Sequence, residues 1–271
     1  MAELQPSQLD GATRLPFAEA IAFFRAKLQR LIPTLRWDDL WKAEHDAAFM
    51  VAGATEADLL ADLAAAVEQA ISQGSSIEQF RRDFRRIVAE RGWTGWTGQG
   101  SAAGVAWRTR IIYATNTATA YAAGRYAQLR EGGFAWWVYR HNDSVLHPRP
   151  QHLAWNGLTL PPDHPFWQTH YPPSGWGCLC YVVGTRSAAG ARRLGGQPDK
   201  PLPDGWDAID PATGEPPGID RGWGYAPGST RADTLRALTA KLQSLPAPLA
   251  KGLADDLARA GAGLVSAPPA P

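Results

Sequence analysis

The sequence has little cysteine, no excess of charge of either sign and no long apolar run. Only two cysteines occur among 271 residues, in the order Cys178-Leu179-Cys180, which excludes the disulfide framework of a small secreted protein. Lysine and arginine total 27 against 26 aspartates and glutamates, so no general attraction to nucleic acid or to an acidic surface is expected. Charged residues interrupt the alanine-rich runs, and we therefore expect no membrane contact and no spanning helix. The first residues lack the pattern of a signal peptide, so we expect synthesis and residence in the cytoplasm.

The distribution of proline divides the chain into zones. Three prolines precede residue 148, whereas fourteen lie from Pro148 to Pro227. Proline disfavours helix interiors, so the fold class predicted is α+β. It has a helical body (residues 1–133), a loop-rich, Trp/Pro-rich β module (134–230), C-terminal helices that pack on the body (231–262) and a disordered tail (263–271).

Apolar periodicity predicts helices at about 17–31, 55–74, 77–88 and 104–130. Ser75 and Glu78 have the spacing of a capping box for the third of these helices. Aromatic and β-branched runs predict strands at 134–140, 158–160 and 181–183. The arginine run at 81–86 surrounds the apolar Phe84, so we interpret it as a solvated helix face rather than a nucleic-acid site.

Histidine gathers near the two cysteines. Five of the six histidines are His141, His147, His152, His164 and His170. A loop-rich region with few strands is often fixed by a structural Zn²⁺. Residues two apart in an extended segment point to the same side, so Cys178 and Cys180 could offer both thiolates to one ion.

Two further ligands would close a tetrahedral zinc site. We predict His152 and His164 for these positions, with His170 as the alternative ligand. Asp143 could orient a ligand histidine or simply cap the turn after the strand. The competing interpretation is that the cysteines are ordinary buried side chains and the histidines pack beside Trp and Pro.

The same histidines, with Asp143, also supply the residue types of a metal-dependent nuclease or another DNA-directed effector. No HExxH helix, Gly-x-Ser-x-Gly elbow or phosphate-binding Gly-Lys-Ser/Thr loop accompanies them. We therefore expect a protein that is not an enzyme, and keep the nuclease as the alternative.

Several ordered motifs run from about residue 17 to about residue 250. They are Phe17–Lys27, Glu44-His45-Asp46 with Phe49, Trp107-Arg108 with Thr115-Asn116, Asp143, Arg149–Leu153, Gly157, Pro162–Trp167, Tyr171–Cys180 and Gly218–Gly228. Together they resemble the phage Mu F-like head morphogenesis family, the minor head proteins of tailed phages and prophages. His152, Cys178 and Cys180 match the family's His and Cys-x-Cys elements. The family's second histidine has no counterpart in residues 174–177, so the resemblance leaves the fourth ligand open.

This resemblance implies a structural role in procapsid formation, associated with the portal and extending to DNA packaging or ejection. The implied partners are the portal protein and the scaffold or major capsid protein, with packaged DNA as a further candidate and no small-molecule substrate. The implied location is the virion head, after assembly in the host cytoplasm. No catalytic residue is carried over, and the structural motif positions are Arg108, Asn116, Asp143, Gly157 and Trp176.

Arg108 and Asn116 stand out as polar residues two turns apart on one predicted helix. If both are desolvated, each needs a hydrogen-bond partner. We therefore expect them to belong to a buried, fully hydrogen-bonded network.

Overall fold

A computed structural model describes residues 17–145, 147–230 and 246–259. The described residues up to Gly228 form one compact unit, and those from Ser229 onward belong to a second. In the second unit, helix α11 (Ala247–Arg259) has Pro248 in its first turn, where proline is tolerated. The rest of the predicted C-terminal helical region and the tail at 263–271 lie outside the described residues, so docking of the tail stays a prediction.

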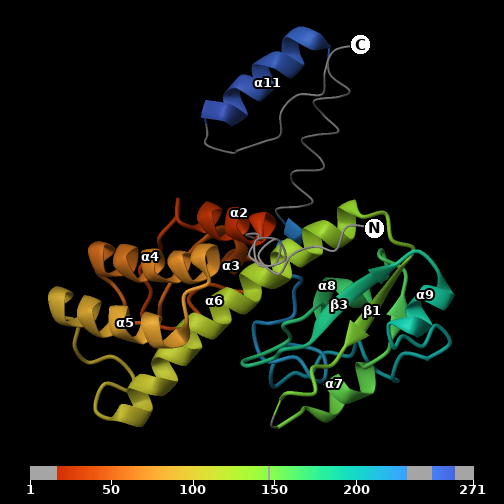
Figure 1. Cartoon of the computed structure of the whole chain (residues 1–271), viewed down its shortest axis with the longest axis horizontal. Coiled ribbons are helices and arrows are strands. Elements are labelled where there is room, and N and C mark those ends of the chain that lie inside the picture. Colours follow the sequence, from red (N-terminus) through yellow and green to blue (C-terminus); the bar gives the residue numbers. More distant parts are fainter. Residues whose placement is uncertain (1–16, 146, 231–245, 260–271) are drawn as a thin grey trace, which may run out of the picture. The chain divides into compact units, whose positions relative to one another are not determined.

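Helices make up the part of the first unit that precedes the sheet (Figure 1). They are α2 (Ala18–Lys27), α3 (Glu44–Ala47), α4 (Ala57–Gln73), α5 (Ile77–Arg91) and α6 (Ala102–Glu131). Their core contains Phe24, Phe49, Leu60, Leu63, Phe80, Phe84 and Ile87, each at most 1% exposed. Together with the sheet described below, they confirm the predicted α+β class.

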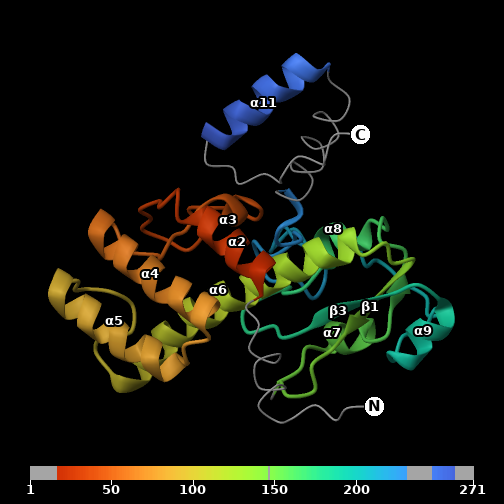
Figure 2. The same cartoon turned by 45° about the horizontal axis from the view of Figure 1, so that its top comes forward.

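A short turn joins α4 to α5, and the two helices lie side by side in Figures 1 and 2. Helix α4 ends at Gly74, whose φ of 69° is the left-handed conformation that glycine adopts readily. The hydroxyl of Ser76, not that of the predicted Ser75, accepts a hydrogen bond from the backbone N–H of Gln79 at 3.3 Å. The capping signal in the sequence was therefore one residue out of register.

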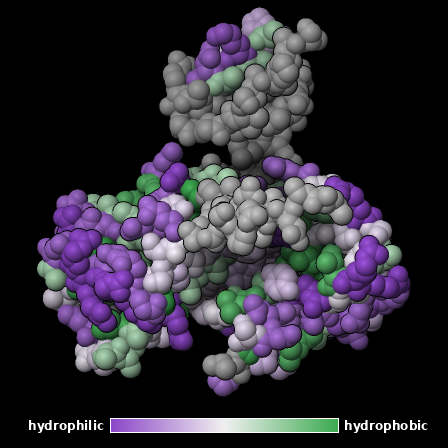
Figure 3. All heavy atoms as spheres, viewed as in Figure 1, coloured by the Kyte–Doolittle hydropathy of each residue, from purple (hydrophilic) through white to green (hydrophobic). Residues whose placement is uncertain are grey.

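The arginines of α5 lie where the sequence predicted. Arg82, Arg85 and Arg86 are exposed and Phe84 is buried, and hydrophilic residues dominate the face over α5 in Figure 3. Among the described residues no helix has the length and apolar character needed to cross a membrane.

Helix α6 has 30 residues, which corresponds to about 45 Å. Ile112 in its first half is part of the helical core. In its second half, Tyr126 makes edge-to-face contacts with Trp137 and Tyr171, at centroid distances of 5.7 and 5.1 Å. One continuous helix thus contributes to the packing of both the body and the module.

The close approach of α2 to α6 depends on Gly124. A Cβ atom at this position would lie 2.6 Å from the backbone nitrogen of Ala20. Any larger residue would therefore push the two helices apart.

The sheet has three antiparallel strands in the order β2-β1-β3. They are β1 (Trp136–Arg140), β2 (Thr159–Leu160) and β3 (Tyr181–Thr185), all within predicted strands or extending them. The pairs Val138↔Val183 and Arg140↔Tyr181 fix the register of β1 on β3. This register determines which residues meet just beyond the strand ends.

Three short helices, which the sequence did not predict, surround the small sheet (Figures 1 and 2). They are α7 (Pro150–Trp155), α8 (Phe166–His170) and α9 (Ala188–Arg193). Many aromatic rings pack between these elements, and Trp137, Tyr139 and Phe166 are fully buried. The module therefore has a core of its own chemical type.

Candidate metal centre

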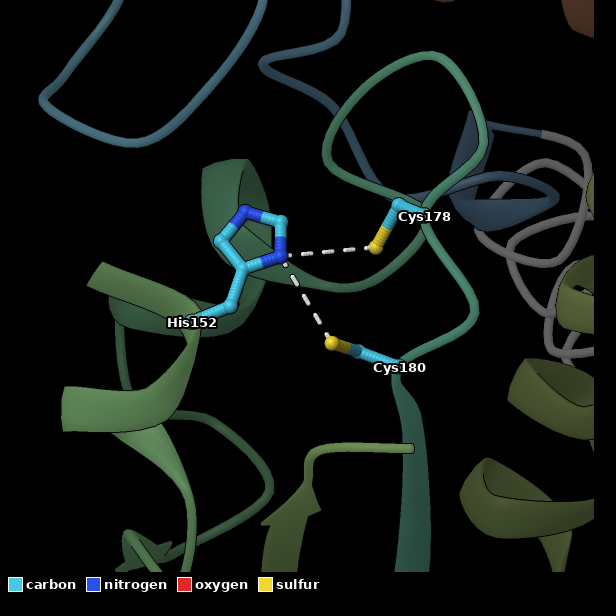
Figure 4. Close-up of side chains that lie close together, drawn as sticks. All are labelled: His152, Cys178 and Cys180. Atoms are coloured by element: carbon cyan, nitrogen blue, oxygen red, sulfur yellow. Dashed lines mark hydrogen bonds between the residues drawn. The ribbon is translucent and has the colours of Figure 1, made fainter. Parts of the chain in front are cut away.

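His152, Cys178 and Cys180 converge on one point (Figure 4). His152 lies on α7, and Cys180 lies directly before β3. Cys178 lies in the loop that joins α8 to β3. The Nδ1 atom of His152 is 3.7 Å from the Sγ atom of Cys178 and 3.6 Å from that of Cys180. The three candidate ligand atoms all lie within 4.8 Å of one another.

These spacings match the dimensions of a zinc site. With Zn–S of about 2.3 Å and Zn–N of about 2.0–2.1 Å, a tetrahedral ion separates its sulfur and nitrogen ligands by about 3.5–3.6 Å. Both sulfur-to-nitrogen distances are within about 0.2 Å of that value. The geometry and the donor types therefore suit Zn²⁺.

The second nitrogen of His152 fixes the chemical form of the ring. Its Nε2 atom is 2.8 Å from the carbonyl oxygen of Gly218, which can only accept, so Nε2 carries the proton. When the ring is neutral, Nδ1 therefore presents a lone pair toward the two sulfurs, as a metal ligand must. The approach of residue 218 requires glycine, since its φ is 88° and a Cβ there would lie 2.6 Å from the Cβ of Gln151.

The pKa values of the two thiols are shifted in opposite directions. The neighbouring Cys180, aided by His152, lowers the pKa of Cys178 to about 4 despite its burial. The adjacent Cys178 and burial raise the pKa of Cys180. Two thiolates this close repel each other without a cation between them, whereas a bound metal ion holds both deprotonated.

His141 extends the group through Cys180. Its Nδ1 atom is 3.5 Å from the Sγ atom of Cys180, and the residue is 5% exposed. Because Arg140 pairs with Tyr181 across the sheet, the next residue of one strand and the preceding residue of the other come together. Besides His152, His141 is thus the described histidine that contacts a cysteine sulfur, although it does not lie within 4.8 Å of all three ligand atoms. The sequence had favoured His164.

His164 lies outside this group. Its Nδ1 atom accepts a hydrogen bond from the backbone N–H of Phe166 at 3.1 Å, and its ring packs against Trp206. The choice of His164 as a ligand does not agree with this geometry, because its imidazole nitrogen is engaged at the start of α8.

His170, the alternative ligand, is a core side chain. It is fully buried, stacks on Phe166 at 4.4 Å and meets the edge of Trp155 at 4.9 Å. Burial lowers its pKa to about 4, so it is neutral near pH 7. It is therefore part of the aromatic core beside the candidate ligands His152, Cys178 and Cys180.

The cysteine loop, residues 171–180, is held by an ion pair that the sequence did not single out. Arg149 and Asp220 meet at 2.6 Å, and the same Asp220 oxygen accepts the backbone N–H of Trp176 at 2.8 Å. The N–H of Asp220 donates in turn to the carbonyl of Ser174 at 3.0 Å. Both charged residues lay in motifs of the sequence, but 71 positions separate them and no spacing rule connects them.

The other motif positions have separate structural roles. Asp143 is exposed, and it is Asn142 whose side chain accepts the N–H of Ser144 in the turn. Gly157, with φ of 85°, accepts a hydrogen bond from the N–H of Gln197 at 2.7 Å. Trp176 packs edge-to-face against Trp37 and Trp223.

Arg108 and Asn116 do not form the predicted network. Asn116 donates to the carbonyl of Ile112 in its own helix. Arg108 donates through Nη2 to the carbonyl of Ala52, while its buried Nε has no partner among the described residues. The expectation of full hydrogen bonding was therefore wrong.

Comparison with known proteins links the chain to one group. Residues 61–183 match the family model described as Phage Mu protein F like protein. The chain is 35% identical, over 88% of its length, to the putative capsid assembly protein F of Escherichia phage Mu. It is 32% identical, over 78% of its length, to the Mu-like prophage FluMu F protein of Haemophilus influenzae. The matches span 60% and 57% of those two relatives, and no solved structure is significantly similar to the chain.

Proposed function

Because the chain belongs to the Mu protein F-like family, we propose that it is a minor head protein that acts in phage or prophage head assembly. The observation that carries this proposal is its similarity to the putative capsid assembly protein F of phage Mu over 88% of its length. The proposed site of action is the procapsid and virion head, reached from the host cytoplasm. The proposed partners are the portal protein and the scaffold or major capsid protein, with packaged DNA as a further contact.

A structural role is favoured over the nuclease alternative by the burial of the candidate metal ligands. His152, Cys178 and Cys180 are 2%, 5% and 9% exposed, which leaves little room for a DNA phosphate to reach a metal held between them. A catalytic zinc keeps one position open to water and substrate. We therefore propose that the protein is not an enzyme.

Head assembly can be tested with the portal protein of the phage or prophage that encodes this chain. Co-expression should yield a complex of the two proteins, and a deletion of the gene should reduce the number of filled heads until the wild-type gene is supplied. Normal heads that lack the protein would overturn the proposal. Plasmid cleavage that requires a divalent metal and disappears in His152→Ala would establish the nuclease instead.

We also propose that the metal centre holds one structural Zn²⁺ through His152, Cys178 and Cys180, with His141 as the fourth ligand. When bound, the ion supplies a cross-link between α7, the cysteine loop and the ends of β1 and β3. The sulfur-to-nitrogen distances and the protonated Nε2 of His152 support this proposal.

Metal analysis of protein purified without chelator tests the zinc proposal. We expect about one zinc per chain, lost in Cys178→Ser/Cys180→Ser and in His152→Ala. Two histidine variants give the matched comparison: His141→Ala should weaken zinc binding by at least about tenfold, and His164→Ala should leave it unchanged. Wild-type protein that is free of metal, and whose melting temperature zinc does not raise, would overturn the proposal.

A further inference from the structure

A cavity of about 110 Å³ lies in the first unit, and its lining includes none of the candidate metal ligands. Helices α2 and α6 contribute to its wall, and so do the segments at 45–52 and 222–225. Its volume is several times the roughly 10–15 Å³ that one water molecule requires on this measure. The cavity can therefore hold a small organic group.

Lys27 lines this cavity and is 5% exposed. Its Nζ atom lies over the rings of Phe23 and Phe24, 5.7 and 5.9 Å from their centroids. No carboxylate of the described residues comes within ion-pair distance of it. A buried ammonium without a close counter-ion is costly.

Arg108 adds a second buried cation to the same wall and is 7% exposed. Among the described residues, Arg108 makes one hydrogen bond, which its Nη2 atom donates to the carbonyl of Ala52. Its buried Nε atom has no partner among them. Its guanidinium carbon lies 5.8 Å from the ring of Trp93. The guanidinium therefore retains unused donors inside the protein.

The described residues that line the cavity include no aspartate or glutamate. The acid that acts on Lys27 is Asp46, whose Oδ2 atom accepts the N–H of Gly228 at 2.7 Å while its buried Oδ1 atom has no hydrogen-bond partner among the described residues. Burial raises the pKa of Asp46 to about 7 and lowers that of Lys27 to about 8. Of the described side chains, two cationic ones thus line the cavity and no carboxylate does.

Much of the remaining wall is apolar or aromatic, including Met50, Ile111, Trp37 and Trp223. Polar side chains also line it, namely His45, Thr115, Asn116 and Thr119. A ligand that suits both parts carries one negative charge and a compact apolar body. The planar fork of an arginine matches a carboxylate in two hydrogen bonds, while a lysine supplies a point charge.

We propose that this cavity binds a carboxylate attached to a small apolar group, with Arg108 and Lys27 as its cationic partners. The carboxylate could belong to a free small acid or to an acidic side chain of a protein segment. Both sources offer the same chemistry to the cavity. The site goes beyond the proposed role in head assembly and does not depend on it.

Titration of the full chain with benzoate tests the proposal, and benzamide provides the neutral control of the same shape. A capped tripeptide with one glutamate, beside its glutamine counterpart, tests the protein-borne source. We expect benzoate, the glutamate peptide, or both to raise the melting temperature, and their neutral counterparts to have no effect. Benzoate alone would identify a free acid as the source, and the peptide alone a protein segment.

Substitutions locate the binding. Arg108→Met and Lys27→Met should each weaken it by about tenfold or more, the loss expected for a charge-assisted hydrogen bond. Arg110→Met, on the same helix but exposed, should bind like the wild type. Arg108→Lys retains the positive charge but lacks the planar guanidinium. Ligand binding can be measured in this variant if Arg108→Met does not fold. Equal effects of the acids and their neutral counterparts, no effect of any ligand, or unchanged binding in Arg108→Lys and Lys27→Met would each overturn the proposal.

Discussion

The helical body and the β module each have a buried core, but the two cores are built in different ways. The body packs apolar residues that recur every three or four positions along α4 and α5, where Leu60, Leu63 and Phe84 are at most 1% exposed. The described residues of the module form three short strands, and its centre is a set of rings and candidate metal ligands brought together from separate segments. Local periodicity specifies the first region, whereas contacts distant in sequence specify the second.

Truncation of one central side chain in each region is the strongest test of this difference. Trp137→Ala in β1 should lower the free energy of unfolding by about 3 to 5 kcal/mol, and Leu63→Ala in α4 by about 2 to 5 kcal/mol, since both side chains are fully buried. Because tryptophans lie in both regions, urea unfolding should be followed by circular dichroism for the helices and by hydrogen exchange of the backbone amides of β1 and β3 for the module.

Because α6 contributes to both regions, the two signals should change together in each variant. Separate transitions, with Trp137→Ala shifting only the amide exchange of β1 and β3, would show that the body and module are independently stable.

A smaller effect is expected at the ion pair that holds the cysteine loop. Asp220→Ala should cost about 1 to 3 kcal/mol, because it leaves Arg149 and the N–H of Trp176 without their acceptor. Asp199→Ala is the matched control in the same module, since its ion pair with Arg192 is largely exposed and should be worth less than about 1 kcal/mol. Equal losses in the two variants would mean that the loop does not depend on Asp220.

The smallest loss of stability is expected at the N-terminal cap of α5 in the body. Ser76→Ala should cost about 1 kcal/mol through loss of the N-cap of α5. Ser75→Ala is the control, because only its backbone carbonyl is used, by the hydroxyl of Tyr113. A larger loss at position 75 than at 76 would contradict the observed capping.

The sequence was sufficient for the long elements of the fold. Helical spacing located α4, α5 and α6 because each spans several turns, over which the periodic pattern is distinct. Helices α7, α8 and α9 have at most six residues, too few for such a pattern. Contacts with the surrounding rings and loops determine where these helices form, and a local sequence pattern does not show those contacts.

The candidate metal centre shows the same limit. Cys178, Cys180 and His152 followed from residue type and motif, but the choice between His141 and His164 required the pairing of β1 with β3. Combining the two predicted strands, at 134–140 and 181–183, into one antiparallel pair could have placed His141 beside Cys180. Nothing in the sequence near His164 indicated that its Nδ1 atom accepts the N–H of Phe166.

The shared helix α6 has a mechanical consequence. Its 30 residues form an unbroken rod, with Ile112 in the packing of the body and Tyr126 in that of the module. The module cannot rotate against the body as a hinged lobe without bending this rod or separating rings from it. A force applied to one region is therefore transmitted along the helix axis to the other.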